Sequence, residues 1–329
     1  MESRRSFLKK TGKSTLFSTM VLSSSVSFPL GFLSRPGRRD DQMRIGIIGA
    51  ENSHTIGYGK LFNIDHKFPG FQVKYVWGET EEFAKNAMEK GAIPNMVSDP
   101  MEMMGKIDAL IVDHRHAKYH LEAATPFVKA GIPTFIDKPF CYRVSEGKEF
   151  LAMARKSGTP VTSYSSIRQS DAAFDIKKQL ESLGEFNHVV SLGPADIESK
   201  YGGIFFYGVH LVDPILFWFG ENVSRVRISK NGKNATASLG YDDGKMVTLI
   251  FKNISSGWDT FVETKEGVIR LSSNVEESDP PKHYVDMVEM FRTGKEPRNH
   301  QSILASVAVL EALEKSVISE EWEDVPGID

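Results

Sequence analysis

A short apolar segment that ends in a glycine turn could bind a phosphate group. Residues 43–50 read Met-Arg-Ile-Gly-Ile-Ile-Gly-Ala, with Gly46 inside a predicted strand and Gly49 at the turn. The match to the GxGxxG fingerprint is partial, because the close-approach positions after the turn hold Ala50 and Asn52. Backbone amides at the start of the next helix would present donors to a pyrophosphate. Asn52 and Ser53 could add donors there or could cap the helix.

A second candidate contact stands where the next strand should end. The fingerprint places an acid at that point to hold ribose hydroxyls. The sequence reads Trp77-Gly78-Glu79. Trp77 could stack beside an adenine, and Glu79 could reach the ribose or favour the start of a helix. Since no arginine stands there to receive a 2′-phosphate, NAD is favoured over NADP, which stays possible.

The loop Asp113-His114-Arg115-His116 also follows a predicted strand, at the sheet edge where open parallel sheets bind ligands. Two histidines and an acid suggest a metal site. No matching ligand set is evident elsewhere in the sequence, so we expect no metal. Asp113 and His116 are instead candidates for cofactor contact.

The elements that must position these residues alternate between strands and helices up to about residue 165. This rhythm predicts right-handed βαβ units and a Rossmann-type parallel sheet with both faces covered, an α/β domain. The expected strands are 43–48, 71–77, 108–113, 134–137 and 160–164, and the expected helices are 53–62, 79–90, 120–130 and 146–157.

Beyond about residue 185 the pattern changes to strands joined by short links. Glycine ends the hairpin signals 242–244 and 265–267, because it accepts the positive φ of tight turns. This half predicts an α+β domain with an open, mainly antiparallel sheet and helices on one face. The expected strands are 189–192, 224–229, 236–241, 246–252, 260–264 and 268–271, and the closing helices are 283–292 and 302–316.

Bulk composition limits the remaining possibilities. The length of 329 residues favours about two domains, and the net charge of −3 gives no reason to expect nucleic acid as a partner. One cysteine, Cys141, rules out an intrachain disulfide.

Residues 3–9, Ser-Arg-Arg-Ser-Phe-Leu-Lys, are typical of a twin-arginine export signal, and the moderately apolar segment after them is too polar for a stable membrane span. We therefore predict a signal and linker (1–38), a dinucleotide-binding domain (39–165) and a substrate and oligomerisation domain (166–329), whose terminal helices could pack back on the first domain. The protein would be exported to the periplasm.

Three motifs in order resemble the Gfo/Idh/MocA oxidoreductase family from about Met43 to the C-terminus. They are the glycine turn, Asp137-Lys138-Pro139-Phe140 after a strand, and the stretch 202–213, Gly-Gly-Ile-Phe-Phe-Tyr-Gly-Val-His-Leu-Val-Asp. The resemblance implies hydride exchange between NAD and a sugar, glycoside or cyclic polyol. It places Lys138 near the nicotinamide, where an ammonium can stabilise an alkoxide, and His210 near the reacting hydroxyl, where an imidazole with a pKa near neutrality can carry its proton. A surface lysine and a core histidine are the alternatives.

Two positions depart from the family pattern. Asp137 replaces a glutamate, and Phe206 replaces an acid four residues before His210. Asp213, one helical turn after His210, could orient the imidazole or serve a structural role, and Pro214 should disturb the helix.

The predicted site residues follow from these motifs. Lys138, His210 and Asp213 are the predicted catalytic residues, and Tyr164, Arg168 and Tyr207 are candidates for substrate contact, although ordinary loop packing explains the first two equally well. The predicted cofactor contacts are Gly46, Gly49, Ala50, Asn52, Ser53, His54, Trp77, Glu79, Asp113, His116, Asp137 and Lys138.

The sequence therefore predicts an exported NAD-dependent oxidoreductase acting on a small carbohydrate. It is expected to be a homo-oligomer through the open sheet. One alternative recycles a bound NAD in a glycoside hydrolase or lyase that passes through a keto-sugar. Another is a sugar-binding homologue without catalysis.

Overall fold

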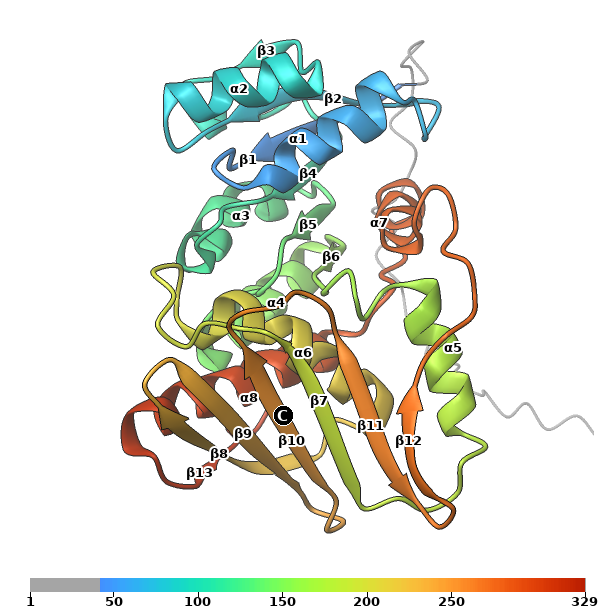
Figure 1. Cartoon of the computed structure of the whole chain (residues 1–329). Coiled ribbons are helices and arrows are strands. Elements are labelled where there is room, and N and C mark those ends of the chain that lie inside the picture. Colours follow the sequence, from blue (N-terminus) through green and yellow to red (C-terminus); the bar gives the residue numbers. More distant parts are fainter. Residues whose placement is uncertain (1–41, 329) are drawn as a thin grey trace, which may run out of the picture. The chain divides into compact units, whose positions relative to one another are not determined.

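The computed structural model describes residues 42–328, so the predicted export signal lies outside the described residues. Two sheets organise this part of the chain (Figure 1). The first is a six-stranded parallel sheet in the order β3-β2-β1-β4-β5-β6, which confirms the predicted Rossmann-type fold. Its elements are β1 (Met43–Ile48), α1 (Ser53–Gly59), the π-helix η1 (Lys60–Ile64), β2 (Phe71–Trp77), α2 (Glu81–Gly91), β3 (Asn95–Met96), η2 (Pro100–Met103), β4 (Ala109–Val112), η3 (Ala117–Tyr119), α3 (His120–Lys129), β5 (Thr134–Ile136), α4 (Val144–Ser157) and β6 (Val161–Thr162).

Local sequence explains where these elements begin and end. All four residues of β4 are buried, as expected for a central parallel strand covered on both faces. Helix α2 begins after Thr80, whose side chain accepts a hydrogen bond from the amide of Phe83, and two glutamates occupy its first turn. Helix α4 ends at Gly158, which adopts φ 65°.

The second sheet has seven strands in the order β12-β11-β7-β10-β9-β8-β13. It is mainly antiparallel, as predicted, but β7 and β10 pair in parallel, so a plain series of hairpins was too simple. The reason is that β10 returns to the middle of the sheet beside β7, after β8 and β9 have formed on its far side. Its elements are α5 (Asp171–Leu180), β7 (His188–Pro194), α6 (Ile204–Phe219), β8 (Val223–Asn231), β9 (Asn234–Tyr241), β10 (Met246–Lys252), β11 (Asp259–Thr264), β12 (Gly267–Leu271), α7 (Lys282–Thr293), α8 (His300–Ser319) and β13 (Glu323–Asp324).

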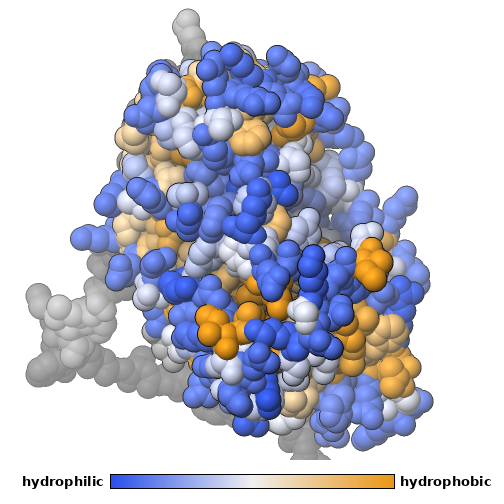
Figure 2. Space-filling model, turned by 60° about the vertical axis from the view of Figure 1, so that its left-hand side comes forward, coloured by the Kyte–Doolittle hydropathy of each residue, from blue (hydrophilic) through white to orange (hydrophobic). Residues whose placement is uncertain are grey.

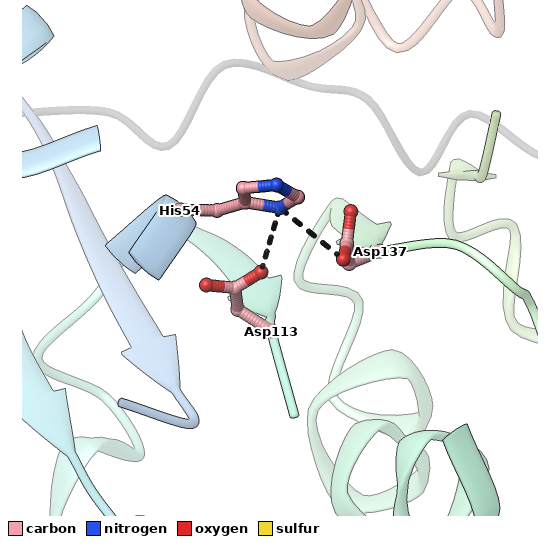
Figure 3. Close-up of side chains that lie close together, drawn as sticks. All are labelled: His54, Asp113 and Asp137. Carbon is pink, nitrogen blue, oxygen red and sulfur yellow. Dashed lines mark ion pairs between the residues drawn. The ribbon is translucent and has the colours of Figure 1, made fainter. Parts of the chain in front are cut away.

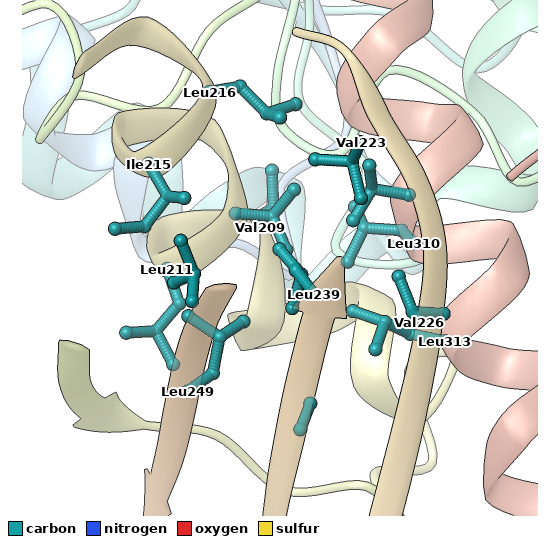
Figure 4. Packing of buried hydrophobic residues seen from close by; sticks show 14 of the residues in the cluster. Val209, Leu211, Ile215, Leu216, Val223, Val226, Leu239, Leu249, Leu310 and Leu313 are labelled. Carbon is teal, nitrogen blue, oxygen red and sulfur yellow. The ribbon is translucent and has the colours of Figure 1, made fainter. Parts of the chain in front are cut away.

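Helices α6 and α8 cover one face of the second sheet. Figure 4 shows side chains of both helices meeting those of the strands, among them Val209 from α6, Leu310 from α8 and Leu239 from β9. Helix α6 continues through Pro214 without interruption, contrary to expectation. Burial of most of its apolar side chains offsets the backbone hydrogen bond that proline cannot donate.

The last two helices also contact the first domain. Met287 and Phe291 of α7 belong to the same apolar cluster as Ile45 of β1. Ile303 and Leu304 of α8 belong to another cluster, which contains Leu151 and other side chains of α4. The two sheets are therefore joined by helices from the C-terminal end of the chain.

The other face of the second sheet carries apolar side chains that are only partly buried, including Val190, Leu192, Ile250 and Phe261. Figure 2 shows that, in the face it presents, apolar colour gathers mostly in the lower half of the molecule, which holds this sheet. Within residues 42–328, no helix is long and apolar enough to cross a membrane.

Candidate functional site

The predicted site residues gather where the strands of the first sheet end. Gly49 follows β1 with φ 111°, and a Cβ added there would lie 2.5 Å from the backbone nitrogen of His114 in the loop after β4. Only glycine lets these two loops approach so closely. Gly46 lies within β1, where a Cβ would meet the side chains of Met103 in η2 and of Ile107 just before β4, so its close packing is against the face of the sheet.

A cavity of about 450 Å³ opens beside the ends of β2 and β4. Two buried polar atoms in its wall, Glu79 Oε1 and His114 Nδ1, have no hydrogen-bond partner among the described residues. A buried polar atom without a partner is costly, and a ligand that carries hydroxyl groups and ring nitrogens would supply the missing partners. The cavity therefore fits the adenosine half of NAD. It is lined by Glu51, Trp77, Glu79, His114, His116, Tyr119, Lys200 and Tyr201.

Glu79 also contacts the loop predicted to bind the pyrophosphate. Its Oε2 accepts hydrogen bonds of 2.8 Å from the amides of both Ala50 and Glu51. Counted from Gly49, Glu51 stands at the second glycine position of the fingerprint and His54 at the third. The Glu51 carboxylate in turn accepts a hydrogen bond of 2.6 Å from the Tyr201 hydroxyl. The two amides thus hold an anionic group, which is what the cofactor's phosphates would offer them.

Asn52, His54, Asp113 and Asp137 come together at the ends of β1, β4 and β5. The Nδ2 of Asn52 donates hydrogen bonds of 3.1 Å to Asp113 Oδ1 and to Asp137 Oδ2. Figure 3 shows the ring of His54 turned so that Nδ1 faces both carboxylates, at 3.7 Å from Asp113 Oδ1 and 3.4 Å from Asp137 Oδ2. All four residues were predicted to contact the cofactor, and the structure shows that they contact one another. Ser53, the first residue of α1, is exposed.

The ionisable groups of this cluster have shifted pKa values. Asp137 is the largest of the causes that raise the pKa of His54 from 6.5 to about 10. Burial raises the pKa of Asp113 to about 6, against the opposing effect of His54. Burial also acts to raise the pKa of Asp137, but Lys138 and His54 outweigh it and hold that pKa below its usual range. Near neutral pH the cluster therefore contains an imidazolium beside two carboxylates.

Lys138 lies at the border between this cluster and the second domain. Its Nζ is 3.5 Å from Asp137 Oδ2 and 5.8 Å from the centre of the Phe206 ring. It lines a small cavity of about 80 Å³ together with His54, Tyr58, Phe135, Asp137, Tyr164, Ser166, His283 and Tyr284. Phe206, at the position where the resemblance would place an acid, thus presents an aromatic face to the ammonium.

His210 lies one helical turn after Phe206. Its Nδ1 is 2.7 Å from the Ser165 hydroxyl, and its ring lies beside those of Tyr207 and Trp258. Burial, assisted by the charge of Lys138, lowers the pKa of His210 to about 3. This differs from the near-neutral pKa expected from sequence, because the imidazole lies among apolar rings and close to an ammonium. The ring is therefore neutral near pH 7, and its lowered pKa makes it a weaker base than the sequence predicted.

Asp213 does not contact His210 among its described hydrogen bonds. Its carboxylate pairs with Arg298 at 2.7 Å and accepts hydrogen bonds from the Ser306 hydroxyl and the Ser165 amide. Asp213 is therefore linked to the imidazole by hydrogen bonds through Ser165. The direct orienting role expected from helical spacing gives way to the buried ion pair with Arg298, a residue that the motifs did not indicate.

The remaining predicted contacts differ in their surroundings. Tyr164 is buried, and its hydroxyl donates to the backbone oxygen of His283. Arg168 is buried, with its guanidinium stacked on Phe217 and bonded to Gln169. Tyr207 is exposed beside His210, while His116 Nδ1 is 2.8 Å from the Tyr142 hydroxyl. Tyr207 thus lies beside His210, Tyr164 lines the smaller cavity with Lys138, and His116 lines the larger cavity.

Five residues that the sequence reasoning missed contribute to the site: Glu51, Thr55, Ser165, Tyr201 and Arg298. Counting the fingerprint from Gly49 would have identified Glu51. The other four are brought to the site by tertiary packing and carry no local signal.

Comparisons with known proteins agree with this architecture. Residues 43–165 match the family described as "Oxidoreductase family, NAD-binding Rossmann fold", Gfo/Idh/MocA. The chain is 31% identical over 187 residues to the uncharacterized oxidoreductase YhhX of Escherichia coli K12. That alignment covers 52% of this chain and 54% of the relative, so the chain spans about half the length of the curated relative that it matches.

Solved structures share the fold at low sequence identity. A putative myo-inositol dehydrogenase from Sinorhizobium meliloti aligns with a TM-score of 0.70 and 15% identity, over 87% of this chain and 100% of that one. The myo-inositol dehydrogenase from Lactobacillus casei, in complex with NAD(H) and myo-inositol, aligns with a TM-score of 0.72 and 12% identity, over 87% and 97% of the two chains.

Proposed function

We propose that this chain, whose residues 43–165 carry the NAD-binding Rossmann fold of the Gfo/Idh/MocA oxidoreductases, exchanges hydride between NAD and a sugar, glycoside or cyclic polyol. The two structural neighbours named above are inositol dehydrogenases by name, and their likeness to this chain concerns the fold. The substrate class is therefore part of the proposal.

One observation carries the proposal. His210 and Lys138 belong to different domains, yet Phe206, one helical turn before His210, has its ring centre 5.8 Å from Lys138 Nζ. The Nδ1 of His210 is 2.7 Å from the hydroxyl of Ser165, which follows β6 of the first sheet. His210 and Lys138 lie near the same sheet edge as the cavity that fits adenosine. A proton acceptor and a cation at the far end of a dinucleotide site are the groups that alcohol oxidation needs.

The residues of the chain divide this work between them. Bound NAD would supply the hydride acceptor, with its adenosine half beside Trp77 and Glu79. His210 accepts the proton of the substrate hydroxyl, and the Ser165 hydroxyl on Nδ1 fixes the plane of the ring. Lys138 stabilises the negative charge that develops on the substrate oxygen as its proton leaves. Asp213 holds Ser165 in place, and Tyr207, exposed beside His210, is the proposed substrate contact on α6.

The activity test is turnover of a panel of sugars, glycosides and cyclic polyols, measured as NADH formation, together with native mass spectrometry of the purified protein. NADH formed in proportion to substrate supports the proposal. A nucleotide that survives extensive dialysis, with substrate consumed and no net NADH, indicates a recycled cofactor in a hydrolase or lyase. NAD binding without any turnover on the panel would contradict an enzymatic role.

Two further parts of the proposal concern location and assembly. We propose export by the twin-arginine route on the basis of residues 3–9. We also propose that two copies pair through the partly exposed apolar face of the second sheet, the face that carries Ile250 and Phe261. N-terminal sequencing of periplasmic protein and the mass of the protein in solution test these two points.

A further inference from the structure

Asn52, His54, Asp113 and Asp137, called here the β-edge cluster, have side-chain atoms spaced like the ligands of one small cation. The measured separations are 3.1 Å from Asn52 Nδ2 to each carboxylate, 3.3 Å from Asn52 Nδ2 to His54 Nδ1, and 3.4 and 3.7 Å from His54 Nδ1 to the carboxylates. Four ligands about 2.0–2.2 Å from a tetrahedral centre lie about 3.3–3.6 Å apart. Five of the six separations among these atoms are thus close to those of a tetrahedral metal site, and the two carboxylate oxygens lie within 4.8 Å of each other.

The imidazole is placed differently from one in an ordinary ion pair. A charge-assisted N–H···O bond is about 2.7–2.9 Å long and points at one oxygen. On the surface of this protein, His188 Nδ1 makes such a contact with Glu263 at 2.7 Å. His54 Nδ1 instead lies at longer distances from two oxygens and faces the space between them (Figure 3). This is how a ligand nitrogen faces a shared centre.

The surroundings of the cluster suit a bound cation. Asp113 and Asp137 are buried, and the Thr55 hydroxyl donates a hydrogen bond to the Asp113 oxygen that faces away from the cluster, as outer-shell groups do for metal ligands. The side chain of His54 is 44% exposed, and His54 and Asp137 both line the cavity of about 80 Å³. A cation can therefore reach the cluster from this cavity.

We propose that the β-edge cluster binds one divalent transition-metal ion, with Zn²⁺ the best fit to one nitrogen and three oxygens in tetrahedral arrangement. Turning the Asn52 amide end for end presents its carbonyl oxygen as the fourth ligand. The turn gives up the 3.4 Å bond from the His54 amide and the two 3.1 Å bonds from Nδ2 to the carboxylates, and the bonds from the ion to these oxygens replace them. The ion takes the place of the proton on His54 Nδ1, so the two carboxylates remain neutralised. The site lies beside Lys138 and does not depend on the proposed oxidation.

The test is zinc binding to the full chain after removal of bound metal with a chelator, followed by titration with ZnCl₂ and, separately, MgCl₂. We expect one Zn²⁺ per chain and little response to Mg²⁺, because imidazole is a poor ligand for Mg²⁺. X-ray absorption of the zinc-loaded protein should show a first shell of nitrogen and oxygen only, at about 2.0–2.2 Å.

Two variants separate this site from adventitious binding. His54→Ala removes an exposed ligand without disturbing the core, and we expect it to weaken zinc binding at least about tenfold. His188→Ala removes the surface histidine paired with Glu263 and should leave zinc affinity unchanged. Wild-type protein that binds no zinc, or His54→Ala protein that binds it as tightly as wild type, overturns the proposal. So does a first shell that contains sulfur.

Discussion

The two ends of the proposed cofactor groove differ in whether their polar side chains have partners. At the adenosine end, Glu79 Oε1 and His114 Nδ1 are buried without partners among the described residues. At the reaction end, His54 and Lys138 pair with the carboxylates of Asp113 and Asp137. Unpaired groups gain new hydrogen bonds when a ligand arrives, whereas paired groups must exchange existing ones. The adenosine end should therefore supply affinity, and the reaction end should supply chemistry.

The largest effect should come from removing either reactive group. Lys138→Ala and His210→Ala are each expected to lower kcat/KM by about 10²-fold or more on the best substrate of the panel, the low end for acid–base or electrostatic catalysis. NAD affinity should change little, because the adenosine contacts remain. Lys129→Ala, on the exposed surface of α3, is the matched control. Equal losses in NAD affinity and in turnover would erase the distinction between the two ends.

Asp213→Asn should lower the stability of the protein more than its turnover. Removing the charge leaves Arg298 buried without its partner, so we expect a loss of about 3–5 kcal/mol in the free energy of unfolding. Chemical denaturation measures this loss directly. Turnover by the fraction that remains folded should fall far less than in Lys138→Ala. A stable Asp213→Asn protein with a large loss in kcat would mean that Asp213 has a direct role in the reaction.

Glu79→Gln should act on the adenosine end alone. A carboxylate that accepts ribose hydroxyls contributes about 1.5–3 kcal/mol, so NAD affinity should fall by about tenfold or more while kcat stays near the wild-type value. The same change removes a negative charge and should narrow the preference for NAD over NADP. Isothermal titration with both dinucleotides measures the two effects. Unchanged affinity for NAD would place the ribose elsewhere.

The smallest effect concerns pH. The pKa of His210 is about 3 in the folded chain, below its ordinary 6.5, so below pH 6.5 the unfolded chain binds a proton that the folded chain does not. Stability should fall as the pH drops from 6.5 toward 3, and His210→Gln should make the fall shallower. Because the ring is only partly buried, we expect a modest difference in the free energy of unfolding between wild type and His210→Gln at low pH. Turnover should show no loss near pH 6.5 that belongs to His210.

Patterning predicted the fold better than the site. The alternation of apolar residues predicted both bounds of β2 and of β10 correctly. In a half-buried strand, apolar buried residues alternate with polar exposed ones, so the sequence pattern is clear. Helix α5 was missed, since it is short and only three of its residues are buried. The parallel pairing of β7 and β10 has no local signal.

The candidate site was predicted as a set of residues but not as an arrangement. Strand ends of a parallel sheet share one edge, so Asn52, Asp113 and Asp137 could be expected near the same ligand. Their contacts with one another, and the burial that makes His210 neutral, depend on how three loops and a second domain pack. Helical spacing suggested Asp213 as the partner of His210, whereas the fold supplied Ser165 and gave Asp213 to Arg298.

The most direct test of the central claim is a crystal structure of the full chain with NAD. We expect adenosine beside Trp77, hydrogen bonds from its ribose to Glu79, and the nicotinamide ring next to Lys138 on the side that faces His210. A dinucleotide bound with its nicotinamide away from both Lys138 and His210 would contradict the account.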